Sequence, residues 1–292
     1  MSPSESSYQE VNGLRYHLRS WGPKDAPMLF LLHGWADVSA SFQFVVDALK
    51  DDWRVIAPDW RGFGDSGWAP GGYWFADYLR DLDEILETYT PDQPANLVGH
   101  SMGGNIACLY AGARPERVAT LMTFEGFGLP PQSPDIAPDR FADWLAECRE
   151  PQRFRDFMDF AQVAQRIQRN SPRISDERAE WLAPHWSKAE GDRVVLRLDP
   201  IHRRPNPVLY REQEVLACWR EITAPVLWVD SDEGEFEQKY TRKGADMDAR
   251  RACFKQLERA VVTEAGHMMH HEQPEQMADL MEDFLSRHGV GA

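Results

Sequence analysis

The sequence has little of what marks secreted, metal-binding or membrane proteins. Its 292 residues include four cysteines, and none of these forms a CxxC pair. Scattered cysteines are typical of a reducing compartment, and they predict neither a disulfide framework nor a metal centre. The first nine residues are polar, unlike a signal peptide. No apolar run reaches the ~18 residues of a membrane span. We therefore expect a soluble, cytoplasmic protein that does not insert into a membrane.

Basic residues are also scarce relative to acidic ones. The chain has 32 lysines and arginines against 47 aspartates and glutamates, which gives a formal charge of −15. Such a surface repels phosphate backbones and anionic membranes, so we expect no nucleic-acid partner. Hydrophobic residues make up 42% of the chain and charged residues 27%. This composition is sufficient for a large buried core.

Strand and helix patterns alternate over the first 125 residues. The wholly apolar run Met28–Leu32 fits a parallel strand that is buried on both faces. Alternation of this kind predicts an α/β fold, with a parallel sheet covered by helices. The expected strands are Leu14–Ser20, which follows an Asn12-Gly13 turn, Met28–Leu32, Arg54–Ala57, Ala95–Val98 and Val118–Phe124. The expected helices are Ser41–Leu49, Phe75–Tyr89 and Met102–Ala113.

The alternation is interrupted after the strand that ends at Phe124. Residues 126–220 lack strand-like apolar runs and contain helical stretches separated by prolines. The strand and helix pattern resumes with Val226–Val229, Ala260–Thr263 and a closing helix, Pro274–His288. We therefore predict a core domain made of residues 1–126 and 222–292, interrupted by a mostly helical domain at 127–221.

A strand-to-helix junction carries the motif G-H-S-M-G at Gly99–Gly103. In this context G-x-S-x-G forms a strained turn that presents the serine hydroxyl above the sheet. Glycines fit there because the close approach of strand and helix leaves no room for a Cβ atom. We therefore predict Ser101 as a nucleophile.

The loop after strand Met28–Leu32 begins with His33-Gly34-Trp35. A serine nucleophile produces a tetrahedral intermediate, whose developing negative charge needs two hydrogen-bond donors. We predict the backbone N–H of Met102 as one donor and that of Trp35 as the other. The neighbouring Ala36 is the alternative to Trp35.

One of the nine histidines lies where a general base is needed. His267 follows Gly266 directly after the last expected strand, late in the chain. This position fits the order nucleophile, acid, base along the sequence. We therefore predict His267 as the base that activates Ser101.

The carboxylate that orients the base has two candidate locations. The loop after strand Val226–Val229 is one, and there Asp232 lies on the turn and is the first candidate. Glu125, at the end of strand Val118–Phe124, is the alternative, because that strand is expected beside the nucleophile strand. Either side chain could hold the imidazole in the right tautomer.

Taken together, these segments resemble the α/β-hydrolase superfamily. The matching motifs occur in family order: LHGW at 32–35, DWRGFGDS at 59–66, GHSMGG at 99–104, AGH at 265–267 and EQP at 272–274. The resemblance implies an α/β-hydrolase fold, with a helical cap domain inserted after the sixth strand and roofing the site. It also implies the same roles for Ser101, His267, Trp35 and Met102.

The resemblance has one departure. The position where the family usually carries its aspartate falls on Gly234, which keeps Glu125 open as the acid. Some haloalkane-dehalogenase relatives use that location. The chain does not resemble those dehalogenases or epoxide hydrolases in its nucleophile, because they carry Asp where Ser101 stands.

These features predict a serine hydrolase that cleaves a carboxylic ester or lactone through an acyl-enzyme, with no cofactor or metal. The alternatives are a C–C bond hydrolase or haloperoxidase-like member of the fold, and a catalytically silent receptor-like homologue. We expect a small-molecule substrate that is partly apolar or aromatic, and a monomer or homodimer. The residues that suggest the substrate are Trp144, Trp181, Trp186 and Trp219, which otherwise form core, and Arg203, Arg204 and Arg211, which otherwise face solvent.

Overall fold

The fold is built on one large sheet. The computed structural model describes residues 1–150 and 152–291, so Pro151 in the predicted insertion and Ala292 at the end of the predicted core lie outside it. Within these residues the sheet has eight strands in the order β1-β2-β4-β3-β5-β6-β9-β10. The strands are β1 (Ser4–Val11), β2 (Leu14–Trp21), β3 (Met28–Leu32), β4 (Arg54–Pro58), β5 (Ala95–His100), β6 (Val118–Phe124), β9 (Val226–Ser231) and β10 (Leu257–Val262).

Most of the sheet is parallel, as predicted. Strands β1, β2 and β4 pair antiparallel, and every pairing from β4 to β10 is parallel. The predicted turn at Asn12-Gly13 joins β1 to β2, and both residues have positive φ, at 50° and 79°. Val11 pairs with Leu14 across this two-residue turn. Strand β1 was not predicted, because its polar residues lie at the edge of the sheet and largely in solvent.

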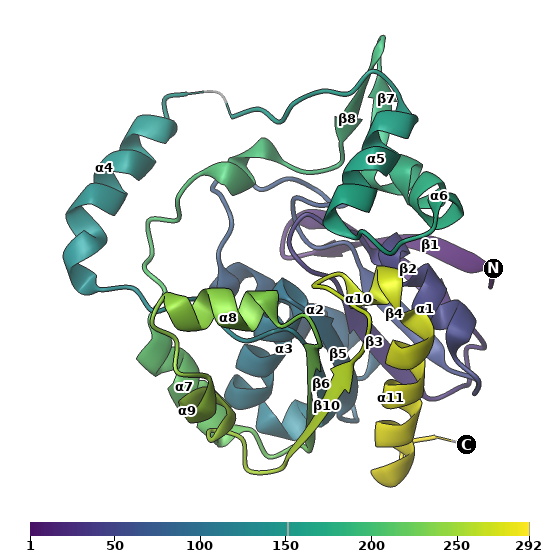
Figure 1. The fold of residues 1–292 in the computed structure, drawn as a ribbon. Helices are drawn as coiled ribbons and strands as arrows, with labels where there is room; N and C mark the ends of the chain where they lie inside the picture. The colour runs from purple at the N-terminus through teal and green to yellow at the C-terminus, as the bar shows by residue number, and fades with distance from the viewer. Residues whose placement is uncertain (151, 292) are drawn as a thin grey trace.

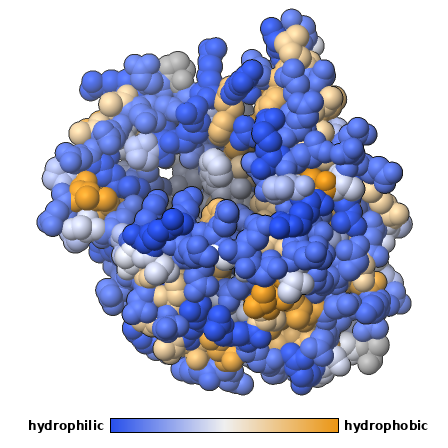
Figure 2. Space-filling model, viewed as in Figure 1, coloured by the Kyte–Doolittle hydropathy of each residue, from blue (hydrophilic) through white to orange (hydrophobic). Residues whose placement is uncertain are grey.

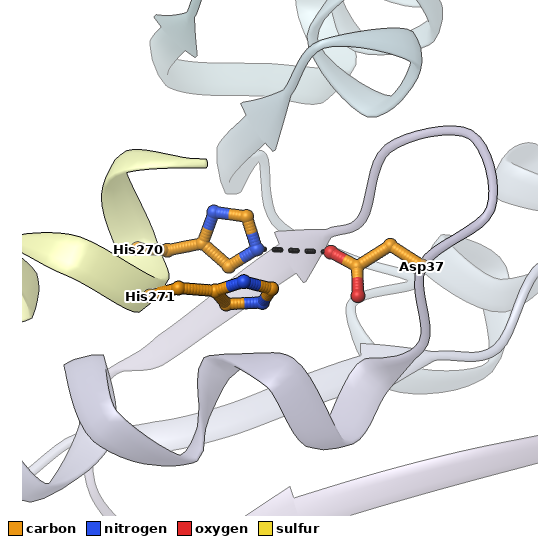
Figure 3. Close-up of side chains that lie close together, drawn as sticks. All are labelled: Asp37, His270 and His271. Carbon is orange, nitrogen blue, oxygen red and sulfur yellow. Dashed lines mark hydrogen bonds and ion pairs between the residues drawn. The ribbon is translucent and has the colours of Figure 1, made fainter. Parts of the chain in front are cut away.

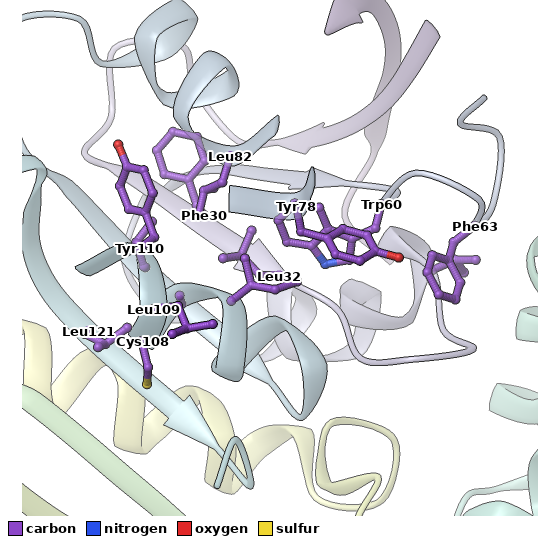
Figure 4. Packing of buried hydrophobic residues seen from close by; sticks show 14 of the residues in the cluster. Phe30, Leu32, Trp60, Phe63, Tyr78, Leu82, Cys108, Leu109, Tyr110 and Leu121 are labelled. Atoms are coloured by element: carbon purple, nitrogen blue, oxygen red, sulfur yellow. The ribbon is translucent and has the colours of Figure 1, made fainter. Parts of the chain in front are cut away.

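Helices cover both faces of the sheet, and successive strand residues point to opposite faces (Figure 1). Phe30 and Leu32 pack against the first face, with helices α2 (Phe75–Tyr89), α3 (Met102–Ala113) and α7 (Glu212–Glu221). Figure 4 shows part of this cluster. Leu29 and Leu31 pack on the other face, with helices α1 (Gln43–Ala48) and α11 (Pro274–Arg287). Full burial of each such side chain stabilises the fold by about 1.5–3 kcal/mol.

The segment between β6 and α7 forms an arch over the sheet (Figure 1). We call residues 126–211 the inserted segment. Helix α4 stands at one end of the arch, and helices α5 and α6 with a two-stranded hairpin stand at the other. The elements are η3 (Pro134–Ile136), α4 (Ala137–Glu147), α5 (Phe160–Asn170), α6 (Asp176–Trp186), β7 (Ser187–Glu190), β8 (Arg193–Leu196) and η4 (Pro200–Arg203).

Helix α7 lies within the predicted insertion but packs closely on the core. A Cβ atom on Gly112 of α3 would lie 2.1 Å from the carbonyl oxygen of Cys218 in α7, so glycine permits this contact. The remaining elements are η1 (Ser39–Phe42), η2 (Pro115–Arg117), α8 (Glu235–Arg242), α9 (Met247–Arg251) and α10 (Met269–Glu272). None of the helices in the described ranges is both long enough and apolar enough to cross a bilayer.

Candidate active site

Ser101 lies on the sharp turn between β5 and α3. Its backbone has φ 51° and ψ −114°, a strained conformation for a residue with a side chain. The Ser101 N–H donates to the Phe124 carbonyl at 2.8 Å, which ties the turn to β6. A Cβ atom on Gly103 would lie 2.0 Å from the Leu32 carbonyl oxygen, so only glycine fits beside β3. The turn thus has the local features of a nucleophile elbow.

His267 meets the serine from the loop between β10 and α10. Its Nε2 lies 3.0 Å from Ser101 Oγ, so the structure brings these two predicted residues together. The imidazole stacks on the Phe236 ring of α8, with centroids 3.7 Å apart and planes inclined by 12°. On the other side of the loop, His100 donates from Nε2 to the His267 carbonyl at 2.7 Å. These contacts hold both the ring and the backbone of His267.

Glu125 is the carboxylate that contacts the histidine. Its Oε2 lies 2.5 Å from His267 Nδ1, and the side chain is buried. The other oxygen, Oε1, accepts hydrogen bonds from the hydroxyl of Ser231 and from its N–H at 3.2 Å. Burial raises the pKa of Glu125, but the hydrogen bond and the charge interaction with His267 outweigh it and lower this pKa below its ordinary value. Glu125 is therefore anionic at neutral pH.

Asp232 was the first candidate for this position, and the structure corrects that expectation. Its exposed carboxylate accepts the N–H groups of Glu264 at 2.8 Å and Ala265 at 3.1 Å. These bonds lower the pKa of Asp232 and tie the loop after β9 to the loop that carries the histidine. Asp232 therefore shapes the approach of His267 from outside, while Glu125 contacts the ring.

The two predicted oxyanion donors adjoin the same cavity as Ser101. Met102 is the first residue of α3, so its N–H has no acceptor one turn earlier in the helix. Trp35 also lines the cavity, and its neighbour Ala36 has a positive φ of 60°. The loop is anchored by His33, whose Nε2 accepts the Trp60 N–H at 2.9 Å. The structure thus places Trp35 and Met102 at the site, and their role remains a prediction.

A buried carboxylate and two histidines support the loop that carries Trp35 (Figure 3). Asp37 Oδ2 accepts from His270 Nε2 at 2.9 Å, and its Oδ1 accepts the Val38 N–H at 2.8 Å. His271 lies beside this pair, and its Nδ1 is 3.1 Å from the Ser171 hydroxyl of the inserted segment. This group joins the loop after β3, helix α10 and the inserted segment.

Within residues 1–150 and 152–291, two groups of side chains have the residue types that bind metals. One is Asp37, His270 and His271, and the other is His17, Asp59 and Asp65, each with ligand atoms within 4.8 Å of one another. In both groups a histidine already bonds directly to the carboxylate, at 2.9 Å for His270 and 2.7 Å for His17. Both arrangements are explained as buried hydrogen-bonded pairs that stabilise loops.

A large cavity lies between the predicted catalytic residues and the inserted segment. Its volume is about 1020 Å³, and Ser101 and His267 lie on its wall. Figure 2 shows the surface hollowed between the arch and the body of the molecule. Many of its lining residues are aromatic, including Trp35, Tyr73, Trp74, Trp144, Trp186 and Phe236. The cavity is at the upper end of the range for small-molecule sites.

Only some of the tryptophans and arginines that suggested a substrate in the sequence line this cavity. Trp144 and Trp186 line it, whereas Trp219 is buried in the core against Trp228 and Trp181 packs on Phe44. Arg204 lines the cavity, and Arg203 and Arg211 lie outside it. Sequence reasoning missed Phe236, Tyr240 and Arg166, which also line the cavity. Phe236 and Tyr240 are four residues apart, a spacing that places both on one face of α8.

A strained serine hydroxyl, an imidazole and a buried carboxylate above a mostly parallel sheet define the class of an α/β hydrolase. The model of the alpha/beta hydrolase fold family matches residues 27–274. The chain therefore belongs to this family, and the resemblance found in the sequence is confirmed.

Known proteins similar to this chain include hydrolases of several kinds. A serine hydrolase-like protein of Danio rerio is 25% identical over 275 residues, which cover 91% of this chain and 83% of that protein. A bifunctional esterase/perhydrolase of Acinetobacter calcoaceticus is 36% identical over 108 residues, 36% of this chain and 38% of that protein. The structure of a thioesterase domain from the curacin biosynthetic pathway superposes with a TM-score of 0.85 at 24% identity, covering 96% of this chain and 99% of that one.

Proposed function

We propose that this protein hydrolyses a carboxylic ester or lactone through an acyl-enzyme formed on Ser101. The observation that carries the proposal is the unbroken line from Ser101 Oγ to His267 Nε2, at 3.0 Å, and from His267 Nδ1 to Glu125 Oε2, at 2.5 Å. A nucleophile, a base and an orienting carboxylate in this sequence perform acyl transfer on several unrelated folds. The esterase name of the Acinetobacter relative also supports it.

In the proposed mechanism, His267 removes the proton from Ser101 as the serine oxygen attacks the carbonyl carbon. The N–H groups of Trp35 and Met102 bind the developing oxyanion. Glu125 accepts the hydrogen bond from Nδ1 and stabilises the imidazolium. His267 then passes its proton to the leaving alcohol. Water activated by the same imidazole attacks the acyl carbon and releases the acid.

The cavity supports a substrate with an apolar or aromatic part. Aromatic side chains from both the core and the inserted segment line it, among them Tyr73, Trp144 and Trp186. Flat, apolar surfaces of this kind bind rings and alkyl chains with little loss of side-chain entropy. We propose that residues 127–221, which comprise the inserted segment from residue 127 onward and helix α7, act as the cap that sets this selectivity.

Labelling with a fluorophosphonate probe tests the nucleophile directly. We expect the native protein to be labelled and S101A to be unlabelled, with unchanged unfolding of that variant. S133A is the matched control, because Ser133 is exposed and far along the chain from the elbow, and it keeps full labelling. A folded native protein that is not labelled would favour the silent, receptor-like alternative.

The reaction type is tested by a substrate panel. We expect turnover of p-nitrophenyl esters and lactones that is lost in S101A. Cleavage of 1,3-diketones in preference to esters would instead assign a C–C bond hydrolase. Peroxide-dependent halogenation that exceeds ester hydrolysis would assign the haloperoxidase-like alternative.

A further inference from the structure

The charged residues that line the cavity are not balanced. Besides histidines, five charged side chains reach its wall, namely Asp37, Asp77, Arg166, Arg197 and Arg204. Asp37 is paired with His270, and Asp77 lies 3.5 Å from the Arg61 guanidinium. Arg197 forms an ion pair with Asp65. Three arginines against two aspartates give these five side chains a formal charge of +1. Arg166 and Arg204 have no carboxylate partner among the residues that the structure describes.

Arg166 projects from helix α5 into this cavity. It shares a helix face with Asn170, four residues later, which also lines the wall. Burial and the neighbouring Arg169 guanidinium lower the pKa of Arg166, and no carboxylate offsets them. A partly buried cation beside a like charge is unfavourable until an anion binds it.

Arg204 reaches the same cavity from the opposite part of the inserted segment, just after η4. Its Nε is buried and has no hydrogen-bond partner among the described residues. The adjacent Arg203 differs, because it is exposed and donates from Nη1 to the Arg153 carbonyl at 2.7 Å. A buried guanidinium N–H without an acceptor is costly, and a bound anion would satisfy it.

The positive charge of the cavity wall contrasts with the negative charge of the whole chain. Acidic residues outnumber basic ones by 47 to 32, so carboxylates are abundant on the chain. Even so, neither Arg166 nor Arg204 is paired with a carboxylate within residues 1–150 and 152–291. The acidic outer surface of the protein repels an anion, whereas the two arginines inside the cavity attract it.

We propose that the substrate carries a second, anionic group, a carboxylate or a phosphate, that Arg166 and Arg204 bind while its ester lies at Ser101. The inference rests on the proposed function and names its substrate class. An apolar or aromatic linker between the two groups fits the aromatic wall. Guanidinium groups bind carboxylate and phosphate oxygens through charge-assisted hydrogen bonds, often two at a time.

Matched esters test the proposal. The substrates are p-nitrophenyl monoesters of dicarboxylic acids of increasing length, their methyl-capped counterparts, and a series that ends in phosphate. We expect kcat/KM at the best length to be about 10-fold or more higher for the anionic ester than for the capped one. The carboxylate and phosphate series then show which anion is preferred.

Variants of the two arginines test whether they cause the preference for anionic esters. R166Q and R204Q reduce the ratio of anionic to capped turnover at least about fivefold each, mainly through KM. R166K and R204K restore part of it, because lysine keeps the charge without the planar fork. R169Q, on the same helix, and R203Q, next in sequence to Arg204, keep the native ratio. A ratio near one in the native protein, or a ratio retained in R166Q/R204Q, would overturn the proposal.

Binding separates this proposal from the proposed function. Calorimetry of free dicarboxylates and of phosphate-ended acids with S101A measures the anion site without turnover. We expect salt-sensitive binding that is lost in S101A/R166Q/R204Q. If the native protein is not labelled by fluorophosphonate and cleaves no ester, the proposed function fails while this measurement still decides the anion site. No binding to S101A at low ionic strength would refute the anion site.

Discussion

The catalytic centre and the inserted segment are built in opposite ways. In the proposed catalytic centre, His267 and Glu125 each have several partners, and both carboxylate oxygens of Glu125 accept hydrogen bonds. In the inserted segment, helix α4 has no buried residue, and its Leu145 is 53% exposed. Several hydrogen bonds hold His267 and Glu125, whereas helix α4 is sparsely packed and presents Trp144 to the cavity. The contrast teaches that the proposed chemistry and the proposed selectivity belong to regions that differ in how closely their side chains are packed.

The strongest test of this contrast compares two carboxylates. E125Q keeps the shape of the side chain but removes the charge that orients His267, so we expect kcat to fall about 10³–10⁴-fold. D232N is the matched control, because Asp232 bonds only backbone N–H groups beside the site, and we expect kcat within a few-fold of the native value. Steady-state kinetics with one p-nitrophenyl ester measure both. Equal losses in the two variants would contradict the geometry.

Packing is expected to show the same contrast in stability. Leu121 of β6 is fully buried, and L121A should lower the free energy of unfolding by about 2–5 kcal/mol. L145A, on the exposed face of α4, should change it by no more than about 0.5 kcal/mol. Urea unfolding followed by circular dichroism measures both values. A large loss in L145A would mean that α4 is packed in solution.

A histidine of the inserted segment should make stability depend on pH. His202 stacks on Tyr73 at 3.7 Å, and burial lowers its pKa to about 3. The unfolded chain binds a proton below the ordinary pKa of about 6.5, and the folded chain does not. Stability is therefore full above pH 6.5 and is lost as the pH falls from 6.5 toward 3, by at most ~1.4 kcal/mol per unit.

His202→Phe removes this titration. Between pH 6.5 and pH 4.5, we expect the variant to lose about 2 kcal/mol less stability than the native protein. Urea unfolding at several pH values gives both slopes. Parallel slopes would show that His202 is protonated as readily in the folded state as in the unfolded one.

The smallest expected effect concerns the residue behind the acid. Ser231 donates twice to Glu125, and both bonds help to hold the pKa of Glu125 low. S231A removes the hydroxyl bond and keeps the N–H bond, so we expect kcat to fall about 3–10-fold and the acid limb of the pH–rate profile to move upward. An unchanged profile would show that His267 alone sets the ionisation of Glu125.

The sequence predicted the parts of the fold that have strong periodicity. Helices Phe75–Tyr89 and Met102–Ala113 and strand Val118–Phe124 were predicted with the bounds that the structure has. The hairpin of β7 and β8 was missed because each strand is only four residues long and β7 is largely polar. The oligomeric state and the domain limits at residues 126 and 221 stay predictions.

The carboxylate that contacts His267 was the part of the site that the sequence could not decide. Several carboxylates follow β9, and motif spacing alone does not tell which way each one points. The choice depends on the register of β6 against β9, where the Glu125 N–H bonds to the Val229 carbonyl at 3.0 Å. It also depends on the positive φ of 51° at Glu125, which turns the chain at the end of the strand. Both are properties of the assembled sheet.

The position of Glu125 on β6 has a consequence for the loop after β9. With Glu125 as the proposed acid, the loop after β9 does not have to supply the carboxylate that contacts His267. Helix α8, which begins there, lends Phe236 and Tyr240 to the cavity wall, and Phe236 covers the imidazole itself. A substitution in α8 can therefore change which molecules fit the cavity without altering the hydrogen bond between Glu125 and His267. A hydrolase whose acid lies in this loop cannot separate the two.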